Sequence, residues 1–326
     1  MRKSGLKAEK TKIILDCDPG HDDAVAIMLA GSAENLQILG IGVEAGNQTL
    51  EKTGRNTLNL VQYLGLDVPV ALGENHPIKR ERQTCAAIHG ETGLDGFDFP
   101  LLNLDFSQEK AVILMKNLLL NNEKVTLVPT GPLTNIGVLL RDYPEVKTHI
   151  EKIVLMGGSM GHGNVSPAAE FNILCDPEAA DIVFKSGLDI YMVGLDVTRK
   201  ALVLPKVMRR MSKIHNKAGL LFVSLMKVFN ENQKKIFGFS GAPLHDPATI
   251  ISLINDDVIK FQKMNVEIDV SGGPSYGRTN CDRFDYLHQP HNAYVAVDIN
   301  VKKYWNEVYK GLKAYSKWKQ FMCLVH

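Results

Sequence analysis

Residues 13–24 read IILDCDPGHDDA, a short apolar run followed by an acidic, turn-forming stretch. Residues 25–30 are apolar again, so the stretch predicts a buried strand, a tight Pro-Gly turn and the start of a helix. Four carboxylates fall within it, on Asp16, Asp18, Asp22 and Asp23. One of them could simply cap the helix, but four like charges this close repel unless a cation or shared protons offset them. All-oxygen clusters suit hard cations such as Ca²⁺ or Mg²⁺.

Working outward, short apolar runs alternate with segments of helical periodicity through the first two-thirds of the chain. Predicted strands are Lys12–Asp18, Gln37–Val43, Val68–Ala71, Val125–Pro129, Lys152–Met156 and Ile190–Gly194. Predicted helices lie near Asp22–Gly31, Leu50–Leu64, Glu109–Asn121, Leu133–Asp142 and Pro177–Lys185. Strands that are apolar on both faces and alternate with helices indicate a parallel sheet covered on both sides. We therefore expect an α/β fold with an open, mostly parallel central sheet, a Rossmann-like core.

The last third of the chain differs in pattern. Residues 205–236 carry apolar side chains at helical spacing and predict one long helix or a helix pair. Two late strands, Asn265–Val270 and Ala293–Ile299, precede an aromatic-rich helix, so the C-terminal region should be mainly helical. No linker or repeat divides the chain. We expect a single domain over residues 12–326 after a flexible basic tail over residues 1–11.

Composition excludes several classes of protein. The chain has 326 residues and a formal net charge of +1, which gives no broad basic surface for nucleic acid. Its five cysteines include no CxxC pair, which fits a reducing compartment. The N-terminal residues lack the apolar segment of a signal peptide, and no apolar run approaches the roughly 20 residues that cross a membrane. We expect a cytoplasmic protein with no membrane partner.

Further polar motifs follow the predicted strands. In a doubly wound sheet, ligands bind beyond the carboxyl ends of the strands, where the acidic turn also lies. The motifs are Gly46-Asn47-Gln48, Thr130-Gly131-Pro132, Met156-Gly157-Gly158 and Asp196. Asn164 and the stretch Glu170-Phe171-Asn172 suit a polyhydroxylated ligand such as a sugar. Several loops are thus expected to converge on one active site.

Two motifs contain histidine. His245-Asp246 could complete a metal site and supply an acid, although an Asp before Pro is also a common helix cap. The stretch from His89 to Gly96 is rich in glycine and predicts a flexible loop, and its pattern leaves open whether His89 reaches a ligand.

Together these motifs resemble the inosine-uridine nucleoside hydrolases. The resemblance rests on the acidic signature of residues 16–24, on residues 45–49, 128–135, 154–158 and 169–172, and on His245-Asp246, and it spans roughly residues 12–299. The loop at residues 88–96 is most similar to that of the pyrimidine-preferring bacterial ribonucleoside hydrolases. The resemblance implies the nucleoside hydrolase fold and the hydrolysis of a ribonucleoside to ribose and free base in nucleoside salvage.

The resemblance also implies roles for individual residues. A calcium ion would be held by Asp18, Asp23, the main-chain carbonyl of Thr130, and Asp246. Asp18 would act as the catalytic base, and His245, or secondarily His89, would serve the leaving base. The expected substrate-binding residues are Asp22, Asn47, His89, Met156, Asn164, Glu170, Phe171, Asn172, Gln233 and His245. The family likeness further implies a homo-oligomer, a tetramer or a dimer.

Base preference depends on the late helix. Gln233 matches a base-contacting glutamine of the pyrimidine-preferring members, but Phe237 stands where those members have a tyrosine. Purine-specific relatives stack the base on tryptophans, and the only tryptophans here, Trp305 and Trp318, lie in the C-terminal helix. We therefore expect a preference for pyrimidine nucleosides such as uridine and cytidine, with a broad inosine/uridine hydrolase as the alternative.

Two other classes of protein share some of these features. A phosphatase with an Asp-x-Asp nucleophile would also place Asp16 and Asp18 after a strand, but it leaves Asp22-Asp23 and His245-Asp246 unexplained. A non-catalytic nucleoside-binding protein would require loss of the base or the acid, and Asp18 and His245 are both present.

Overall fold

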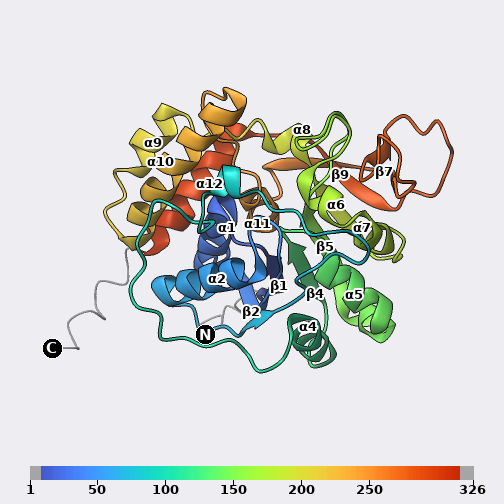
Figure 1. Cartoon of the computed structure of the whole chain (residues 1–326), viewed down its shortest axis with the longest axis horizontal. Helices are drawn as coiled ribbons and strands as arrows, with labels where there is room; N and C mark the ends of the chain where they lie inside the picture. Colours follow the sequence, from blue (N-terminus) through green and yellow to red (C-terminus); the bar gives the residue numbers. More distant parts are fainter. Residues whose placement is uncertain (1–8, 316–326) are drawn as a thin grey trace, which may run out of the picture.

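The structure is a computed structural model and describes residues 9–315. A nine-stranded sheet forms its centre, in the spatial order β3-β2-β1-β4-β5-β6-β9-β7-β8 (Figure 1). The strands are β1 (Thr11–Cys17), β2 (Leu36–Val43), β3 (Val70–Leu72), β4 (Val125–Pro129), β5 (Ile150–Met156), β6 (Ile190–Val193), β7 (Ile259–Ile268), β8 (Thr279–Asp282) and β9 (Ala293–Ile299). Neighbours from β3 to β9 pair in parallel, whereas β7 is antiparallel to β9 and to β8.

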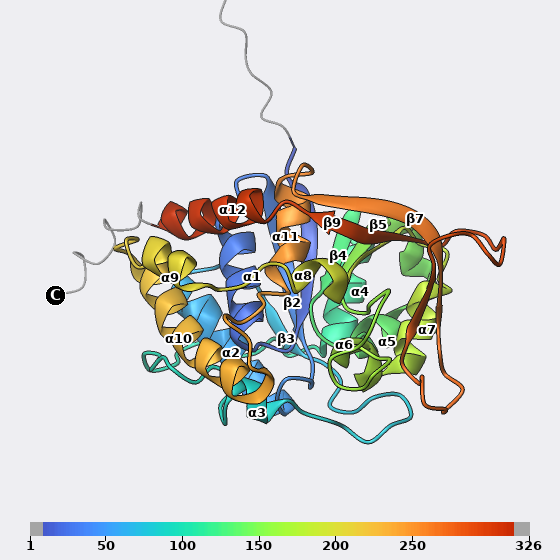
Figure 2. The ribbon, with the colours of Figure 1, turned by 90° about the horizontal axis from the view of Figure 1, so that it is seen from above.

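Helices cover both faces of the sheet (Figures 1 and 2). The helices on one face are α1 (His21–Ser32), α2 (Leu50–Leu64), α9 (Pro205–Met211), α10 (Lys217–Phe237), α11 (Pro247–Ile254) and α12 (Val301–Ala314). The helices on the other face are α4 (Ala111–Leu120), α5 (Thr134–Asp142) and α7 (Pro177–Phe184). Short helices α3 (Ala86–His89), α6 (Phe171–Cys175) and α8 (Leu195–Thr198) and a 3-10 helix, Pro144–His149, complete the elements. The expected mostly parallel α/β fold with a helical C-terminal region is confirmed.

Strand β1 shows how alternation builds this three-layer arrangement. Side chains of Ile13, Leu15 and Cys17 join the apolar core under α1, while Ile14 joins the core under α4 and α5. Successive strand residues point to opposite faces, so a strand that is apolar throughout must be covered on both sides. The sequence pattern therefore dictates the layering.

Capping side chains set the ends of the longer helices. The side chain of Asn216 accepts a hydrogen bond from Gly219 N at 2.8 Å at the start of α10. Asn300 does the same for Lys303 N at 3.0 Å in α12. Helix α10 ends at Gly238, whose φ of 70° is the left-handed conformation that glycine adopts without strain. These caps explain why the region predicted as one helix or a pair is the pair α9 and α10.

The strand order places the site. The chain runs from β1 outward through β2 to β3 and then returns to add β4 on the other side of β1. The point of reversal lies between β1 and β4, where Asp16 pairs with Pro129 in register. Loops leaving the carboxyl ends of two such strands diverge to opposite faces and open a crevice between them. The acidic turn after β1 and Thr130 after β4 both border this crevice.

Several elements differ from the sequence expectation. Strand β7 begins at Ile259, six residues before its predicted start at Asn265, and β8 was not predicted. Helices α3, α6, α8 and α11 were also missed, because segments this short carry little periodicity. His89 ends α3, whereas residues 90–96 form no helix or strand, as expected. Residues 1–8 of the tail expected at residues 1–11 lie outside the described residues, and so does Trp318. No helix within residues 9–315 is both long and apolar enough to cross a membrane.

Candidate active site

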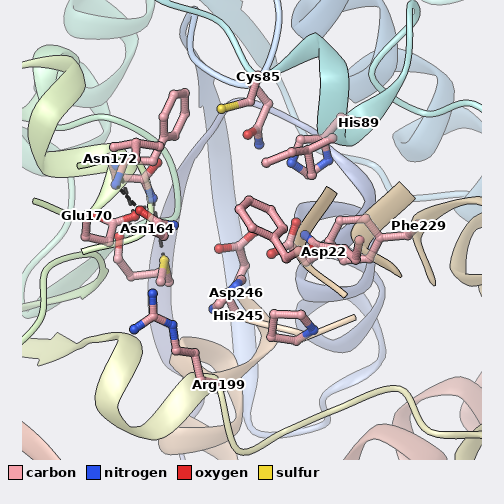
Figure 3. A pocket seen from close by; sticks show the side chains of 18 of the residues that line it. Asp22, Cys85, His89, Asn164, Glu170, Asn172, Arg199, Phe229, His245 and Asp246 are labelled. Carbon is pink, nitrogen blue, oxygen red and sulfur yellow. Dashed lines mark hydrogen bonds between the residues drawn. The ribbon is translucent and has the colours of Figure 1, made fainter. Parts of the chain in front are cut away.

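A pocket of about 220 Å³ opens at the crevice between the strand ends (Figure 3). Its polar end, as we call it, consists of side chains that follow the strands and of those facing them: Asp22, Asn47, Thr130, Met156, Asn164, Glu170, Asn172 and Asp246. Its aromatic end is formed mainly by α3 and α10: Ile88, His89, Phe229, Gln233, Phe237 and Phe239. The polar motifs expected to converge contribute lining residues to this pocket, with the exception of Asp196. Figure 3 shows Asn164, Glu170 and Asn172 on one side, Asp22 and Asp246 at the centre, and His89 and Phe229 on the other side.

Carboxylates crowd the floor of the polar end. Oxygens of Asp22, Asp23 and Asp246 all lie within 4.8 Å of one another. The neighbouring Asp18 is fully buried, and its Oδ2 accepts a hydrogen bond from Asn47 N at 2.6 Å. Its Oδ1 has no hydrogen-bond partner among the described residues. An unsatisfied buried carboxylate oxygen is costly, so the donor set fits a hard cation that would bind it.

The charge state of the cluster points the same way. Burial, with a smaller contribution from the charge of Asp23, raises the pKa of Asp22 to about 7 and that of Asp18 well above its ordinary value. Burial and then the charge of Asp22 raise the pKa of Asp246 as well. Without a cation the raised pKa values favour the protonated carboxyl groups, whereas a divalent ion would stabilise their ionised forms.

The four expected metal ligands lie close together, with one difference in detail. Asp23 Oδ1 accepts a hydrogen bond from Thr130 Oγ1 at 2.7 Å, so Thr130 borders the cluster. Its carbonyl oxygen, however, accepts a hydrogen bond from Asn172 Nδ2 at 2.8 Å. The tightest carboxylate group contains Asp22, which was expected to bind substrate, together with Asp23 and Asp246.

Asp16 lies apart from this cluster. Strict alternation along a strand would place the side chains of Asp16 and Asp18 on the same face. In the fold Asp16 Oδ1 instead accepts a hydrogen bond from Asn135 Nδ2 of α5 at 2.8 Å, behind the pocket. The strand ends at Cys17, so the strict alternation no longer applies to Asp18. Burial raises the pKa of Asp16 to about 7. Glu44, which the sequence analysis missed, is equally buried, and the pKa of Glu44 is raised by burial and further by the nearby charge of Asp16.

The sugar-binding candidates of the polar end are fixed by hydrogen bonds. Glu170 caps α6, accepting hydrogen bonds from Asn172 N at 3.0 Å and Ile173 N at 3.2 Å, and it also accepts one from Gly158 N at 3.0 Å. The side chain of Asn172 also donates to the carbonyl oxygen of Met156 at 3.0 Å. Strand β5 is thereby tied to α6. Rigid polar groups in a buried wall are suited to orienting hydroxyl groups.

The aromatic end has a different construction. The rings of His21, His89 and Phe229 stack with centroid distances of 5.1–5.5 Å. Gln233 is only 4% exposed, and its Oε1 has no partner among the described residues, so it can accept a hydrogen bond from a ligand. Phe237 is 42% exposed and stacks on Phe239 at 5.4 Å.

Both histidines of the pocket are neutral at pH 7. Burial, with a smaller effect of the nearby Arg199, lowers the pKa of His245 to about 3. Burial also lowers the pKa of His89. A neutral imidazole carries one N–H and can donate a hydrogen bond. His245 can therefore stabilise a departing group by donating a hydrogen bond, without transferring its proton.

Several lining residues were not found from the sequence. They are Cys85, Ile88, Arg199, Phe229, Phe239 and Pro243. Apart from Ile88, which begins the loop at residues 88–96, none belongs to a motif used in the sequence analysis, and Phe229 has the helical spacing of an ordinary core residue. The only signal was indirect, since Arg199 follows Asp196 and the end of a predicted strand. Trp305 lies in α12, and among residues 9–315 no tryptophan lines the pocket.

Comparison with known proteins identifies close relatives of the whole chain. The sequence model of the inosine-uridine preferring nucleoside hydrolases matches residues 13–306. The pyrimidine-specific ribonucleoside hydrolase RihB of Escherichia coli (strain K12) is 46% identical over 310 residues, which are 95% of this chain and 99% of that protein. A purine-preferring ribonucleoside hydrolase from Gardnerella vaginalis superposes with a TM-score of 0.88 at 33% identity, covering 94% of this chain and 99% of the other. A plant nucleoside hydrolase, the PpNRh1 enzyme, gives 0.87 at 27% identity and covers 93% and 99%.

Proposed function

The chain belongs to the inosine-uridine preferring nucleoside hydrolase family, and on that premise we propose that it is a calcium-dependent ribonucleoside hydrolase that prefers pyrimidine nucleosides. The observation that carries the proposal is the buried carboxylate cluster, with the unpaired Asp18 Oδ1, at the floor of a polar pocket. A phosphatase would need only two of these carboxylates, and a binding protein would need no base.

We propose Asp18, Asp23, Asp246 and the carbonyl of Thr130 as the calcium ligands, with Asp22 in immediate contact. When bound, the ion would supply a fixed positive charge that orients the ribose hydroxyls and the attacking water. The donor set is all oxygen, as calcium prefers. Calcium lowers the pKa of water far less than zinc does, so a protein base is still required.

Asp18 is the proposed base. As the C1′–N bond breaks, its electron pair goes to the base nitrogen, the water oxygen bonds to C1′, and one water proton passes to Asp18. The transition state resembles an oxocarbenium ion with positive charge on the ribose. The carboxylates of the polar end are preorganised around that charge and stabilise it. Asn47, Asn164, Glu170 and Asn172 orient the sugar, and Met156 and Phe171 border it.

His245 is proposed to serve the leaving base as a hydrogen-bond donor. Its depressed pKa leaves the ring neutral at pH 7, so it lends a hydrogen bond and keeps its proton while the base departs as an anion. A uracil anion is stabilised by its two carbonyl groups and needs less help than a purine. His89, stacked on Phe229, is the second candidate for contact with the base.

The proposed pyrimidine preference is supported by the aromatic end and by the relatives. Gln233 offers an unpaired buried carbonyl oxygen for a base N–H. The pocket within residues 9–315 contains phenylalanines and no tryptophan, and the 46% identical Escherichia coli relative is named as pyrimidine-specific. The 33% identical Gardnerella relative is named as purine-preferring. The alternative that the experiment must distinguish is therefore a hydrolase that accepts both inosine and uridine.

The test is ribose release from uridine, cytidine and inosine, measured side by side with and without a calcium chelator. We expect faster release from the pyrimidine nucleosides, lost on chelation and restored by added calcium. Equal or faster release from inosine would contradict the base preference and leave the hydrolase intact. Activity that survives exhaustive chelation would contradict the calcium dependence, and absence of ribose from all three nucleosides would contradict the activity.

The remaining parts of the proposal concern context. We propose one domain over residues 12–326, a cytoplasmic location, a role in nucleoside salvage and a homotetramer or homodimer. Light scattering of the purified chain would give the assembly, and a single calorimetric transition at saturating calcium would support the single domain.

A further inference from the structure

Helix α8 is a single helical turn beside the pocket, and Arg199, directly after it, lines the pocket. It follows β6 after a single residue, Gly194. Thr198 at its end contacts His245, and Arg199 just after it contacts the segment before Asn164. Asp196 Oδ2 accepts a hydrogen bond from Met160 N at 2.8 Å. Arg199, the residue after the helix, donates to the carbonyl oxygens of His162 at 3.3 Å and Gly163 at 2.6 Å. The helix is therefore anchored on two sides to the segment that leads into Asn164.

Between these two anchors, Thr198 faces His245. Thr198 is fully buried, and its Oγ1 lies 2.7 Å from His245 Nδ1. The other ring nitrogen, Nε2, makes no hydrogen bond to any residue in the described range, and His245 lines the pocket. Thr198 thus holds one edge of the ring and leaves the opposite edge for a ligand.

The direction of this hydrogen bond follows from the surroundings of the hydroxyl group. Threonines elsewhere in the fold donate to the carbonyl oxygen four residues earlier, Thr57 at 2.8 Å and Thr53 at 3.3 Å. Within the described residues Thr198 makes no such bond, so His245 Nδ1 is the acceptor available to its proton. The reverse arrangement would leave a buried hydroxyl proton without an acceptor, which is costly. A donating Thr198 requires the imidazole proton to be on Nε2.

We propose that Thr198 is a positioning residue that fixes His245 in the tautomer with its Nε2 proton toward the leaving base. This inference rests on the proposed function. Thr198 touches no reacting atom, and it acts by keeping His245 oriented and able to donate. Without that hydroxyl the Nε2–H tautomer loses its partner, and the alternative Nδ1–H tautomer presents a lone pair to the base.

The experiment compares Thr198→Val with Thr198→Ser on two substrates. Uracil needs less help than a purine, but it departs as an anion that a hydrogen bond stabilises, whereas p-nitrophenyl β-D-ribofuranoside releases a more stable phenolate that needs no hydrogen bond. We expect Thr198→Val to lower kcat on uridine about 10- to 100-fold and to change kcat on the nitrophenyl riboside less than about threefold. Thr198→Ser, which retains the hydroxyl, should return kcat on uridine to within about threefold of the unmodified enzyme.

Two controls separate positioning from a structural effect. Thr57→Val removes a buried helical hydroxyl that bonds only its own helix, and it should leave the ratio of the two substrates unchanged. On a His245→Ala background, Thr198→Val should cause no further loss on uridine, because the residue it acts through is gone.

Equal losses on both substrates, or losses that multiply with His245→Ala, would overturn the inference. If Thr198→Val folds poorly, the serine variant still decides: a large loss on uridine with serine at this position would also overturn it. Failure of the unmodified enzyme to hydrolyse either substrate would instead contradict the proposed function, so the two failures are distinguishable.

Discussion

The polar end and the aromatic end of the pocket differ in how they are built. Side chains of the polar end follow the carboxyl ends of parallel strands and are mostly buried and held by hydrogen bonds. Asp22 is 5% exposed, Glu170 3% and Asn172 6%. The aromatic end comes from α3 and α10, which Figure 2 shows side by side. There His89, Phe229 and Gln233 are equally buried but Phe237 is 42% exposed, and the rings of His89 and Phe229 stack.

This difference suggests a division of labour. Groups fixed on strand ends can be held to the precision that bond breaking requires. Helix faces joined mainly by ring stacking can change with little effect on the sheet, and this is suited to selecting among bases. Changes in the polar end should therefore reduce turnover of all nucleosides alike, whereas changes in the aromatic end should alter the ratio between them.

The largest effect should come from Asp18→Asn. The substitution keeps the shape but removes the proposed base and one metal ligand, so kcat should fall by about 10³- to 10⁴-fold. Steady-state kinetics on uridine and inosine would measure it, and both should fall by the same factor. Asp257→Asn, a substitution of an exposed aspartate, is the matched control and should retain the kcat of the unmodified enzyme on both substrates. A changed uridine/inosine ratio in Asp18→Asn would break the division of labour.

A second large effect should appear in the pH dependence of stability. Burial raises the pKa of Asp22 and of Asp16 from 3.8 to about 7. The folded metal-free protein therefore binds more protons than the unfolded chain between about pH 4 and 7, and its stability should decrease as pH rises through that window. Bound calcium would replace the proton of Asp22 and should reduce the decrease, whereas Asp16, which lies apart from the cluster, keeps its own contribution.

Calorimetry with chelator and with saturating calcium at about pH 5 and about pH 8 would test this. We expect the fall in Tm from the lower to the higher pH to be larger in chelator than in calcium. A metal-free protein that becomes more stable with rising pH would contradict the assignment of these carboxylates as protonated.

A moderate effect should follow from Arg199→Met. The loss of both carbonyl contacts would release the segment that leads into Asn164. Hydrogen bonds from a charged group are worth about 1.5–3 kcal/mol, and the partial exposure of the Arg199 side chain reduces this value. KM for uridine should therefore rise by about tenfold. Because the proposed effect passes through Asn164, Arg199→Met should add little on an Asn164→Ala background. Fully multiplicative effects in this double-mutant cycle would show that Arg199 acts in another way.

The smallest effect should come from Phe237→Tyr. The hydroxyl group introduced at this position would be able to bond the base, but the side chain at residue 237 is 42% exposed. A hydrogen bond from this hydroxyl group should therefore contribute less than one in a buried site, roughly 0.5–1 kcal/mol, which corresponds to a factor of about two to five in kcat/KM. We expect kcat/KM for uridine to rise relative to inosine by that factor, with Phe284→Tyr in an exposed loop as the control. An unchanged ratio would place Phe237 outside the base contact.

Prediction from sequence was most complete where local pattern and function coincide. The run at residues 13–24 specified strand, turn, helix and acidic cluster together, because alternation and turn chemistry act over a few residues. Asn172 and Glu170 were found for a similar reason, since a polar motif after a strand marks the edge of the sheet. The exact partners were not predictable. Asp16 accepts a hydrogen bond from Asn135, and the carboxylate of Asp22 lies beside those of Asp23 and Asp246.

The sequence by itself determined the parallel α/β layering and the acidic chemistry of the site, because both arise from periodicity and charge within short segments. Only the tertiary structure decided that Phe229, Arg199 and Thr198 belong to the site. These residues carry ordinary local signals. Helix α10 packs against α1 and α3, which brings Phe229 to the pocket, while Arg199 lines the pocket and Thr198, which follows β6 in the chain, contacts His245. Contacts between distant segments depend on how the layers pack, which no local pattern records.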